Sequence, residues 1–300
     1  MVSEPTVLIV GAGGSIPYGF PSGPELVQEI TTACIEPRRP NPLAESLLKI
    51  GCEDVLMYEF ARQLMASRRY SVDAFLEKNS RFMEIGKLSI AGALLPLEKA
   101  PGFVENDWYR FLCDRLIRNI DAGKTERLTV ATYNYDRSLD FYLYDAFKHS
   151  FNLNDEEMPG FLSNLEIIHL HGSLGPCSWL EISKGVPRSN GQLGHPQFVR
   201  AIRGIKIIHE QADDGEEYGR LRRVVGTAKR LVCLGFGYHP TNVKRLLHGG
   251  WLSHHHSVLG SALGLSIPER NDVEHMFDRR ISLTNEDCYR MLKNQVGIIS

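Results

Sequence analysis

The sequence predicts an α/β fold, with a Rossmann-like parallel sheet, helices on both faces and an inserted helical subdomain. Two observations predict it. An apolar, β-branched run at residues 6–10 breaks directly into Gly11 and Gly13, as a buried parallel strand does when it ends in a phosphate-binding turn. From residue 127 onward, short apolar runs alternate with helix-length segments, which indicates strands joined by crossover helices.

A long loop follows the first strand. Ile16 stands where a dinucleotide-binding G-x-G-x-x-G turn has its third glycine. A helical pattern begins only at Pro24, with proline in its first turn, and is expected to end at Ile35 before the proline-rich break at 36–42. The loop at 11–23 is therefore too long for a simple hydride-transfer site.

The next block, residues 44–120, has a helical pattern almost throughout and no strand signal. Interruptions fall near Ser71, Gly86 and 101–102. Because the block stands between the first strand and the second, we expect a helical subdomain that covers the site. The whole chain, 1–300, is then one nucleotide-binding domain with this insertion.

The second half of the chain supplies the remaining elements. Strands are expected at 127–133, 166–170, 230–234 and near 257–265, and helices at 137–149, near 217–229, at 241–248, near 271–279 and near 285–294. Ligands of open α/β sheets bind beyond the carboxyl ends of the strands. The polar clusters that follow the strands are therefore expected to face one crevice.

Four short motifs stand at strand ends in a fixed order: Gly-Ala-Gly-Gly-Ser at 11–15, Thr-Tyr-Asn-Tyr-Asp at 132–136, His-Gly at 171–172 and Gly-Phe-Gly-Tyr-His-Pro at 235–240. Over roughly residues 6–290, they resemble motifs of the sirtuin (SIR2) superfamily: its NAD-binding loop, its Thr-Gln-Asn-x-Asp strand end, its catalytic His-Gly and a glycine turn near the adenosine. The resemblance implies that NAD is bound as a substrate.

The chain is more similar to bacterial SIR2-like proteins of anti-phage defence, of the HerA-associated type, than to protein deacylases. The segments that resemble this branch are 19–23, 71–76, 235–240 and 283–289. The resemblance implies a homo-oligomer whose partner is a HerA-type ATPase or another phage-sensing protein.

Two departures separate the chain from the deacylases. Deacylases carry zinc on two Cys-x-x-Cys pairs, and a tetrathiolate site needs such pairs. Here no cysteine lies within four residues of another: they are Cys34, Cys52, Cys113, Cys177, Cys233 and Cys288. We therefore expect no metal. Tyr133 replaces the glutamine of the Thr-Gln-Asn motif, which counts against acyl-lysine chemistry.

Composition and charge are those of an ordinary globular protein, with 43% hydrophobic and 23% charged residues and a net charge of −2. There is no signal-peptide pattern, and no apolar run reaches the roughly 18 residues that span a bilayer. The basic stretch at 220–230 is expected to be the solvated face of a helix. A cytoplasmic protein that binds neither membrane nor nucleic acid is expected.

Asn134 and His171 are the candidate catalytic residues. Nicotinamide is a cationic leaving group, so cleavage of its ribosyl bond mainly needs a stabilised oxocarbenium-like centre and a placed nucleophile. A carboxamide can orient a water or the ribose hydroxyls, and an imidazole can accept a proton at neutral pH. By spacing alone, His169 on the same strand is an equal candidate; the His-Gly resemblance favours His171.

Cofactor-binding residues are expected at the same strand ends. Asp136 orients the ribose or the loop, or else caps the helix that follows it; Ser15 contacts phosphate or only shapes the turn. The full set is Gly11, Ala12, Gly13, Ser15, Phe20, Thr132, Tyr133, Asp136, Gly172, Gly235, Phe236 and Gly237.

Three other conspicuous sites have weaker interpretations. Asp73 is best explained as a first-turn charge that favours a helix dipole, although the resemblance places it near the site. His239 contacts the adenosine or lies on the surface. The side chains of the consecutive histidines 254–256 diverge, which disfavours a shared metal.

The sequence thus predicts an NAD⁺ hydrolase that gives nicotinamide and ADP-ribose and acts in anti-phage defence by NAD depletion. An NAD-dependent protein deacylase and a catalytically silent NAD- or ADP-ribose-binding scaffold are the alternatives. An unrestrained hydrolase would exhaust the host's cofactor, so its activity is expected to depend on assembly with further copies or with a partner.

Overall fold

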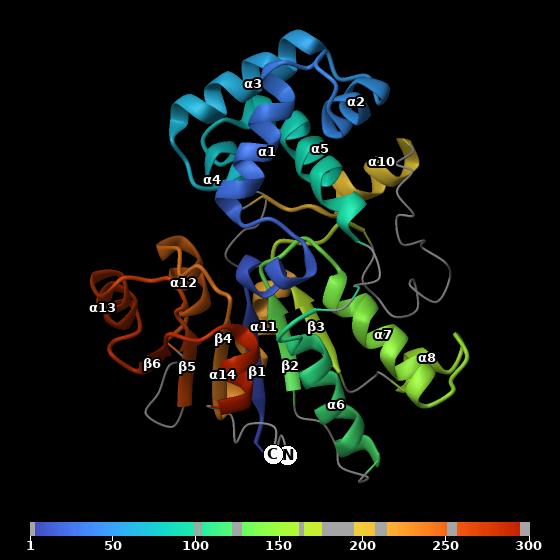
Figure 1. Cartoon of the computed structure of the whole chain (residues 1–300). Helices are drawn as coiled ribbons and strands as arrows, with labels where there is room; N and C mark the ends of the chain where they lie inside the picture. Colours follow the sequence, from blue (N-terminus) through green and yellow to red (C-terminus); the bar gives the residue numbers. More distant parts are fainter. Residues whose placement is uncertain are drawn as a thin grey trace.

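A computed structural model describes residues 4–98, 102, 104–121, 128–161, 165–175, 195–207, 215–250 and 257–294 of the chain. Its centre is a sheet of six parallel strands in the order β3-β2-β1-β4-β5-β6 (Figure 1). This is the strand order of the doubly wound dinucleotide-binding fold. The predicted fold class is therefore confirmed. The strands are β1 (Thr6–Val10), β2 (Leu128–Thr132), β3 (Glu166–His169), β4 (Arg230–Leu234), β5 (Ser257–Ser261) and β6 (Ile281–Thr284).

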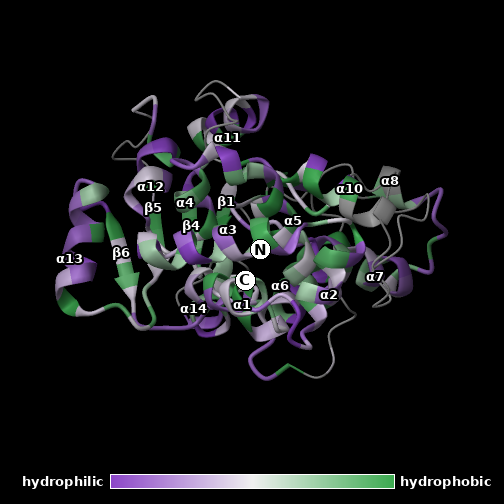
Figure 2. Ribbon diagram, turned by 90° about the horizontal axis from the view of Figure 1, so that it is seen from above, coloured by the Kyte–Doolittle hydropathy of each residue, from purple (hydrophilic) through white to green (hydrophobic). Residues whose placement is uncertain are grey.

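Successive side chains of a strand point to opposite faces of the sheet. Helices cover both faces here, so the side chains of the central strands are buried on both sides. In β1, Leu8 and Val10 pack with α6 (Trp108–Asp121), α7 (Ser138–Ser150) and α14 (Cys288–Asn294). Val7 and Ile9 lie on the other face of the sheet, where they pack with α11 (Glu216–Thr227), α12 (Pro240–Leu246) and α13 (Ile267–Met276). Figure 2 shows hydrophobic strands β5 and β6 beside an α13 of mixed hydropathy. The short α8 (Met158–Phe161) adjoins the end of α7.

A second, all-helical layer stands beyond the carboxyl ends of the strands (Figure 1). We call it the helical lobe. It has its own core, separate from the two cores that cover the sheet. The helical lobe contains α1 (Gly23–Ile35), α2 (Pro42–Lys49), α3 (Asp54–Ser67), α4 (Val72–Leu76), α5 (Met83–Leu94) and α10 (His195–Gly204).

The helical lobe differs in extent from the predicted insertion at 44–120. Helix α1 belongs to it through α3, and α10 joins it from far along the chain by packing on α5. Helix α6 lies instead on the sheet, because Trp108, Leu112 and Leu116 recur every fourth residue and bury one stripe against β1 and β2. Within the described parts of the chain, no helix is long and apolar enough to cross a membrane.

Candidate functional site

A cavity of about 630 Å³ lies between the strand ends and the helical lobe. This volume is within the range of small-molecule and cofactor sites. Ten of the predicted site residues line this cavity: Gly11, Ala12, Ser15, Phe20, Tyr133, Asn134, Asp136, His171, Phe236 and Gly237. Four predicted residues do not line it: Gly13, Thr132, Gly172 and Gly235.

The glycine turn after β1 is locked to the glycine turn after β4. The Gly13 N–H donates to the Gly235 carbonyl over 2.9 Å. A Cβ atom on Gly13 would lie 2.8 Å from the Gly235 Cα, and Gly235 itself has a φ of +55°. These two glycines therefore shape the cavity floor by close backbone approach, which no other residue permits.

The long loop after the turn is ordered and leads into the helical lobe. Two short 3₁₀ turns, η1 (Ala12–Gly14) and η2 (Ile16–Tyr18), replace the helix of a dehydrogenase turn. Ser22 and Glu25 then form a reciprocal capping box at the start of α1. Because the helix begins late, the loop crosses the cavity edge and buries Phe20.

Asn134 is held by the glycine turn through its side-chain nitrogen. Its Nδ2 atom donates to the Gly11 carbonyl over 3.0 Å and to the Ser15 hydroxyl over 2.9 Å. Thr132 fixes the backbone at the same point, since its hydroxyl accepts from the Asn134 N–H over 3.0 Å. Both amide protons are thus used. The Asn134 Oδ1 atom is the group that remains for a ligand, and it is an acceptor.

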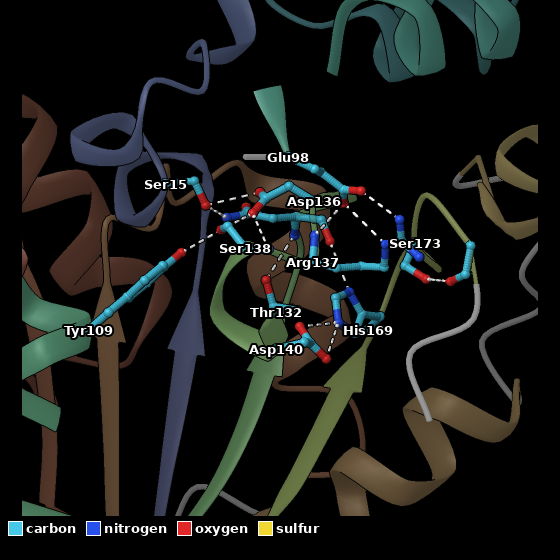
Figure 3. Close-up of polar contacts among 12 residues, drawn as sticks. Ser15, Glu98, Tyr109, Thr132, Asp136, Arg137, Ser138, Asp140, His169 and Ser173 are labelled. Carbon is cyan, nitrogen blue, oxygen red and sulfur yellow. Dashed lines mark hydrogen bonds and ion pairs between the residues drawn. The ribbon is translucent and has the colours of Figure 1, made fainter. Parts of the chain in front are cut away.

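Asp136 contacts both the glycine turn and the first residue of α7. Its Oδ2 atom accepts from the Ser15 hydroxyl over 2.9 Å, while Oδ1 accepts from the backbone N–H and the hydroxyl of Ser138 at the start of α7 (Figure 3). Burial raises the pKa of the Asp136 carboxyl, and the hydrogen bonds from Ser138 and Ser15 oppose that rise. Asp136 therefore ties the glycine turn to the first turn of α7.

His169 and His171 have different surroundings. The His169 ring is occupied on both sides: Nδ1 lies 3.2 Å from the Asn134 carbonyl oxygen, and Nε2 lies 3.1 Å from an Asp140 carboxylate oxygen (Figure 3). His169 does not line the cavity. It supports the backbone of Asn134 from below.

His171 lines the cavity and is 5% exposed. Its buried Nε2 atom has no hydrogen-bond partner among the described residues. Its ring meets the edge of Tyr133, with the ring centres 5.1 Å apart. Burial, together with the nearby Arg245 guanidinium, lowers the pKa of His171 to about 4. The imidazole is therefore neutral at pH 7 and has one unprotonated ring nitrogen.

Tyr133 packs against two other rings that line the cavity, those of Phe236 and His171. Its hydroxyl donates to the Asn242 carbonyl on α12 over 3.2 Å, and its ring lies 5.0 Å from that of Phe236. Gly172, the residue after His171, has a φ of +68°, and a Cβ there would lie 1.9 Å from the Gly204 carbonyl oxygen at the end of α10. Its role is thus to bring α10 close to the strand ends.

Asp73 lines the cavity, whereas the sequence favoured a first-turn helix charge and only the resemblance placed it near the site. It does lie in the first turn of α4, which Ser71 caps. Its carboxylate also accepts a hydrogen bond from the Tyr135 hydroxyl and lines the cavity. The 71–76 motif was the only signal for this position. His239 also lines the cavity, as do Arg68, Arg69, Glu77 and Asn242, which the sequence did not single out.

The described residues test only part of the prediction that no metal is bound. The described part of the chain contains no group of three or more His, Cys, Asp or Glu side chains that could hold a metal ion. Histidines 254–256 and Cys177 lie outside the described residues. The absence of a metal therefore stays a prediction.

Comparisons with known proteins find similar solved structures. No protein-family model matches the sequence, and no curated protein does. A solved structure of Sir2Tm bound to a propionylated peptide is similar, with 15% sequence identity, 98% of this chain and 94% of that chain covered, and a TM-score of 0.43.

Proposed function

We propose that this chain is an NAD⁺ glycohydrolase, which cleaves the nicotinamide N-ribosyl bond with water. One observation carries the proposal: Asn134 and His171 reach from two strand ends into one cavity beside the glycine turn, and His171 presents a buried Nε2 atom without a partner in the described structure. An unsatisfied buried polar atom costs free energy. A hydroxyl or water of a bound ligand removes that cost.

In the proposed reaction, the Asn134 Oδ1 atom accepts a hydrogen bond from the attacking water or from a ribose hydroxyl and so fixes its position at the reacting carbon. As the water oxygen bonds to the reacting ribose carbon, the neutral His171 accepts a proton from that water. The bond between ribose and nicotinamide breaks with its electron pair moving to the ring nitrogen, which neutralises the pyridinium. No acid is needed for this leaving group.

The test is incubation of the purified chain with NAD⁺ and separate quantification of nicotinamide, ADP-ribose and cyclic ADP-ribose. We expect the amount of nicotinamide to equal the summed amount of linear and cyclic ADP-ribose. Asn134→Ala should abolish nicotinamide release. Exhaustive chelation of metals should leave nicotinamide release unchanged. Nicotinamide release only in the presence of an acylated peptide would assign a deacylase instead. Binding of ADP-ribose without any turnover would assign a scaffold.

We further propose that the enzyme works in the cytoplasm as an effector of anti-phage defence, gated by assembly. The segments similar to that branch support this role, and so does the helical lobe, which closes one side of the cavity. A small shift of this lobe would displace the loop at 11–23. Turnover is therefore expected to rise with protein concentration, or with a HerA-type ATPase or another phage-sensing partner. Full activity of a dilute monomer would contradict the gate.

A further inference from the structure

The cavity contains a carboxylate that the proposed reaction does not use. Asp73 projects from the helical lobe, opposite the strand ends, and its described hydrogen-bond partner in the cavity is the Tyr135 hydroxyl. No lysine or arginine of the described residues forms an ion pair with it. Burial raises the pKa of Asp73. A half-buried carboxylate without a cation is costly unless a ligand supplies one.

Charge is separated along the cavity wall. Arg68 and Arg69, in the turn after α3, are exposed and line the opening. Neither forms an ion pair with a described acidic residue. Glu77, one turn beyond Asp73, also lines the cavity and is less exposed than the two arginines. A ligand with an anionic portion and a cationic portion would match this arrangement.

The position of Asp73 relative to the reacting atoms follows from Tyr135. This residue is next to Asn134 in the chain, and its side chain reaches from the strand end to the carboxylate. The Tyr135 ring also lies near that of His171, with the ring centres 6.3 Å apart. A ligand group held by Asn134 and His171 is therefore separated from Asp73 by no more than the length of the Tyr135 side chain.

We propose that Asp73 makes the cavity selective for the oxidised dinucleotide, whose nicotinamide ring is cationic, over the reduced dinucleotide, whose ring is neutral. The inference rests on the proposed function, because the ring must lie beside Asn134. Opposite charges a few ångströms apart in a partly buried site attract each other enough to favour the cation by about tenfold. The arginines at the opening attract the diphosphate, which both forms share, and so do not discriminate.

The test measures dissociation constants for NAD⁺, NADH and ADP-ribose by titration calorimetry in a His171→Ala background, in which turnover is expected to be at least about 100-fold slower. Asp73→Asn keeps the size of the side chain and an acceptor for Tyr135 but removes the charge. We expect it to weaken NAD⁺ binding about tenfold and to change the other two constants less than twofold. Arg69→Gln is expected to weaken binding of all three ligands alike.

Glu45→Gln is the matched control, because it makes the same charge change on the exposed side of α2, away from the cavity. It should leave all three constants unchanged. Equal weakening of all three ligands by Asp73→Asn, or no weakening, would overturn the selectivity of Asp73 while leaving the hydrolase proposal standing. Failure of the parent protein to bind any dinucleotide would overturn the proposed function, and this inference with it.

Discussion

The side-chain nitrogen of Asn134 lies 2.9 Å from the Ser15 hydroxyl, to which it donates a hydrogen bond. Ser15 in turn donates to Asp136, so a chain of polar contacts joins the end of β2 to the turn after β1. The same nitrogen also binds the Gly11 carbonyl. The carboxamide orientation is thereby fixed, since a carbonyl can only accept. A displaced glycine turn would therefore displace the proposed catalytic group.

The first prediction separates the chemical role of Asn134 from its role as a support. Asn134→Ala removes the Oδ1 acceptor and should lower the rate of NAD⁺ cleavage by at least about 100-fold. Ser15→Ala removes one of the two contacts of Nδ2 but keeps Oδ1, so we expect a loss of about tenfold or less. Initial rates of nicotinamide release measure both. Equal losses would mean that the amide acts only through the loop.

The parts of this site that the sequence predicted are those encoded by local patterns. An apolar run that ends in Gly11 or Gly235 is a buried strand entering a turn, and strands β1 and β4 fall at the predicted residues. Edge strand β6 was missed because Ile281–Thr284 is a short, half-exposed segment with no long apolar run. Tertiary contacts, such as the one between Asp73 and Tyr135, leave no periodic signal.

The two histidines show where a local rule stops. Alternation along a strand predicts that His169 and His171 share one side. Strand β3 ends at His169, however, and Gly172 turns the chain in the left-handed region. The alternation therefore does not reach His171, which enters the cavity while His169 stays below it.

The second prediction contrasts these histidines. His171→Ala should lower turnover by at least about 100-fold with little loss of stability, because its Nε2 atom has no described partner. His169→Ala leaves the Asp140 carboxylate buried without its described partner, so it should lower the free energy of unfolding by about 1–3 kcal/mol with a milder effect on turnover. Urea unfolding and nicotinamide release separate the two effects. The opposite pattern in folded proteins would assign the base to His169.

The third prediction concerns the pH dependence of stability. The folded pKa of His171 is about 4, below the ordinary value of 6.5. Between these values the unfolded chain binds a proton that the folded site refuses, so this residue's contribution to stability falls as the pH drops from 6.5 toward 4. The loss is about 1.4 kcal/mol per pH unit.

The matched variant for this test is His171→Gln, which cannot titrate. Carboxyls with raised pKa values, such as Asp73 and Asp136, change stability in the opposite direction but are present in both proteins. Between pH 6.5 and 5, the wild type should therefore lose about 2 kcal/mol more than the variant in the free energy of unfolding. Parallel curves would show that His171 protonates freely in the folded protein.

The last prediction concerns the ion pair that joins the end of the helical lobe to the segment after β2, residues 133–137, which we call the catalytic loop because it contains the proposed catalytic Asn134. Glu98 follows η4 (Leu95–Leu97), and its fully buried carboxylate accepts three hydrogen bonds from Arg137 (Figure 3): from the backbone N–H over 2.9 Å, from Nε over 3.1 Å and from Nη2 over 2.5 Å. Arg137 directly follows Asp136. The pair therefore fixes the strand-end segment against the helical lobe.

Removing one partner of a buried pair leaves an uncompensated charge, which costs about 3–5 kcal/mol. We expect Glu98→Gln to lower the free energy of urea unfolding by that amount. The control is Asp54→Asn, which makes the same change in the solvent-exposed pair with Arg38 and should have a much smaller effect, because water screens exposed ion pairs. The double variant Glu98→Leu, Arg137→Met removes both charges and should recover part of the stability. If it restores stability but not nicotinamide release, the pair positions the catalytic loop; if both return, the pair serves packing alone.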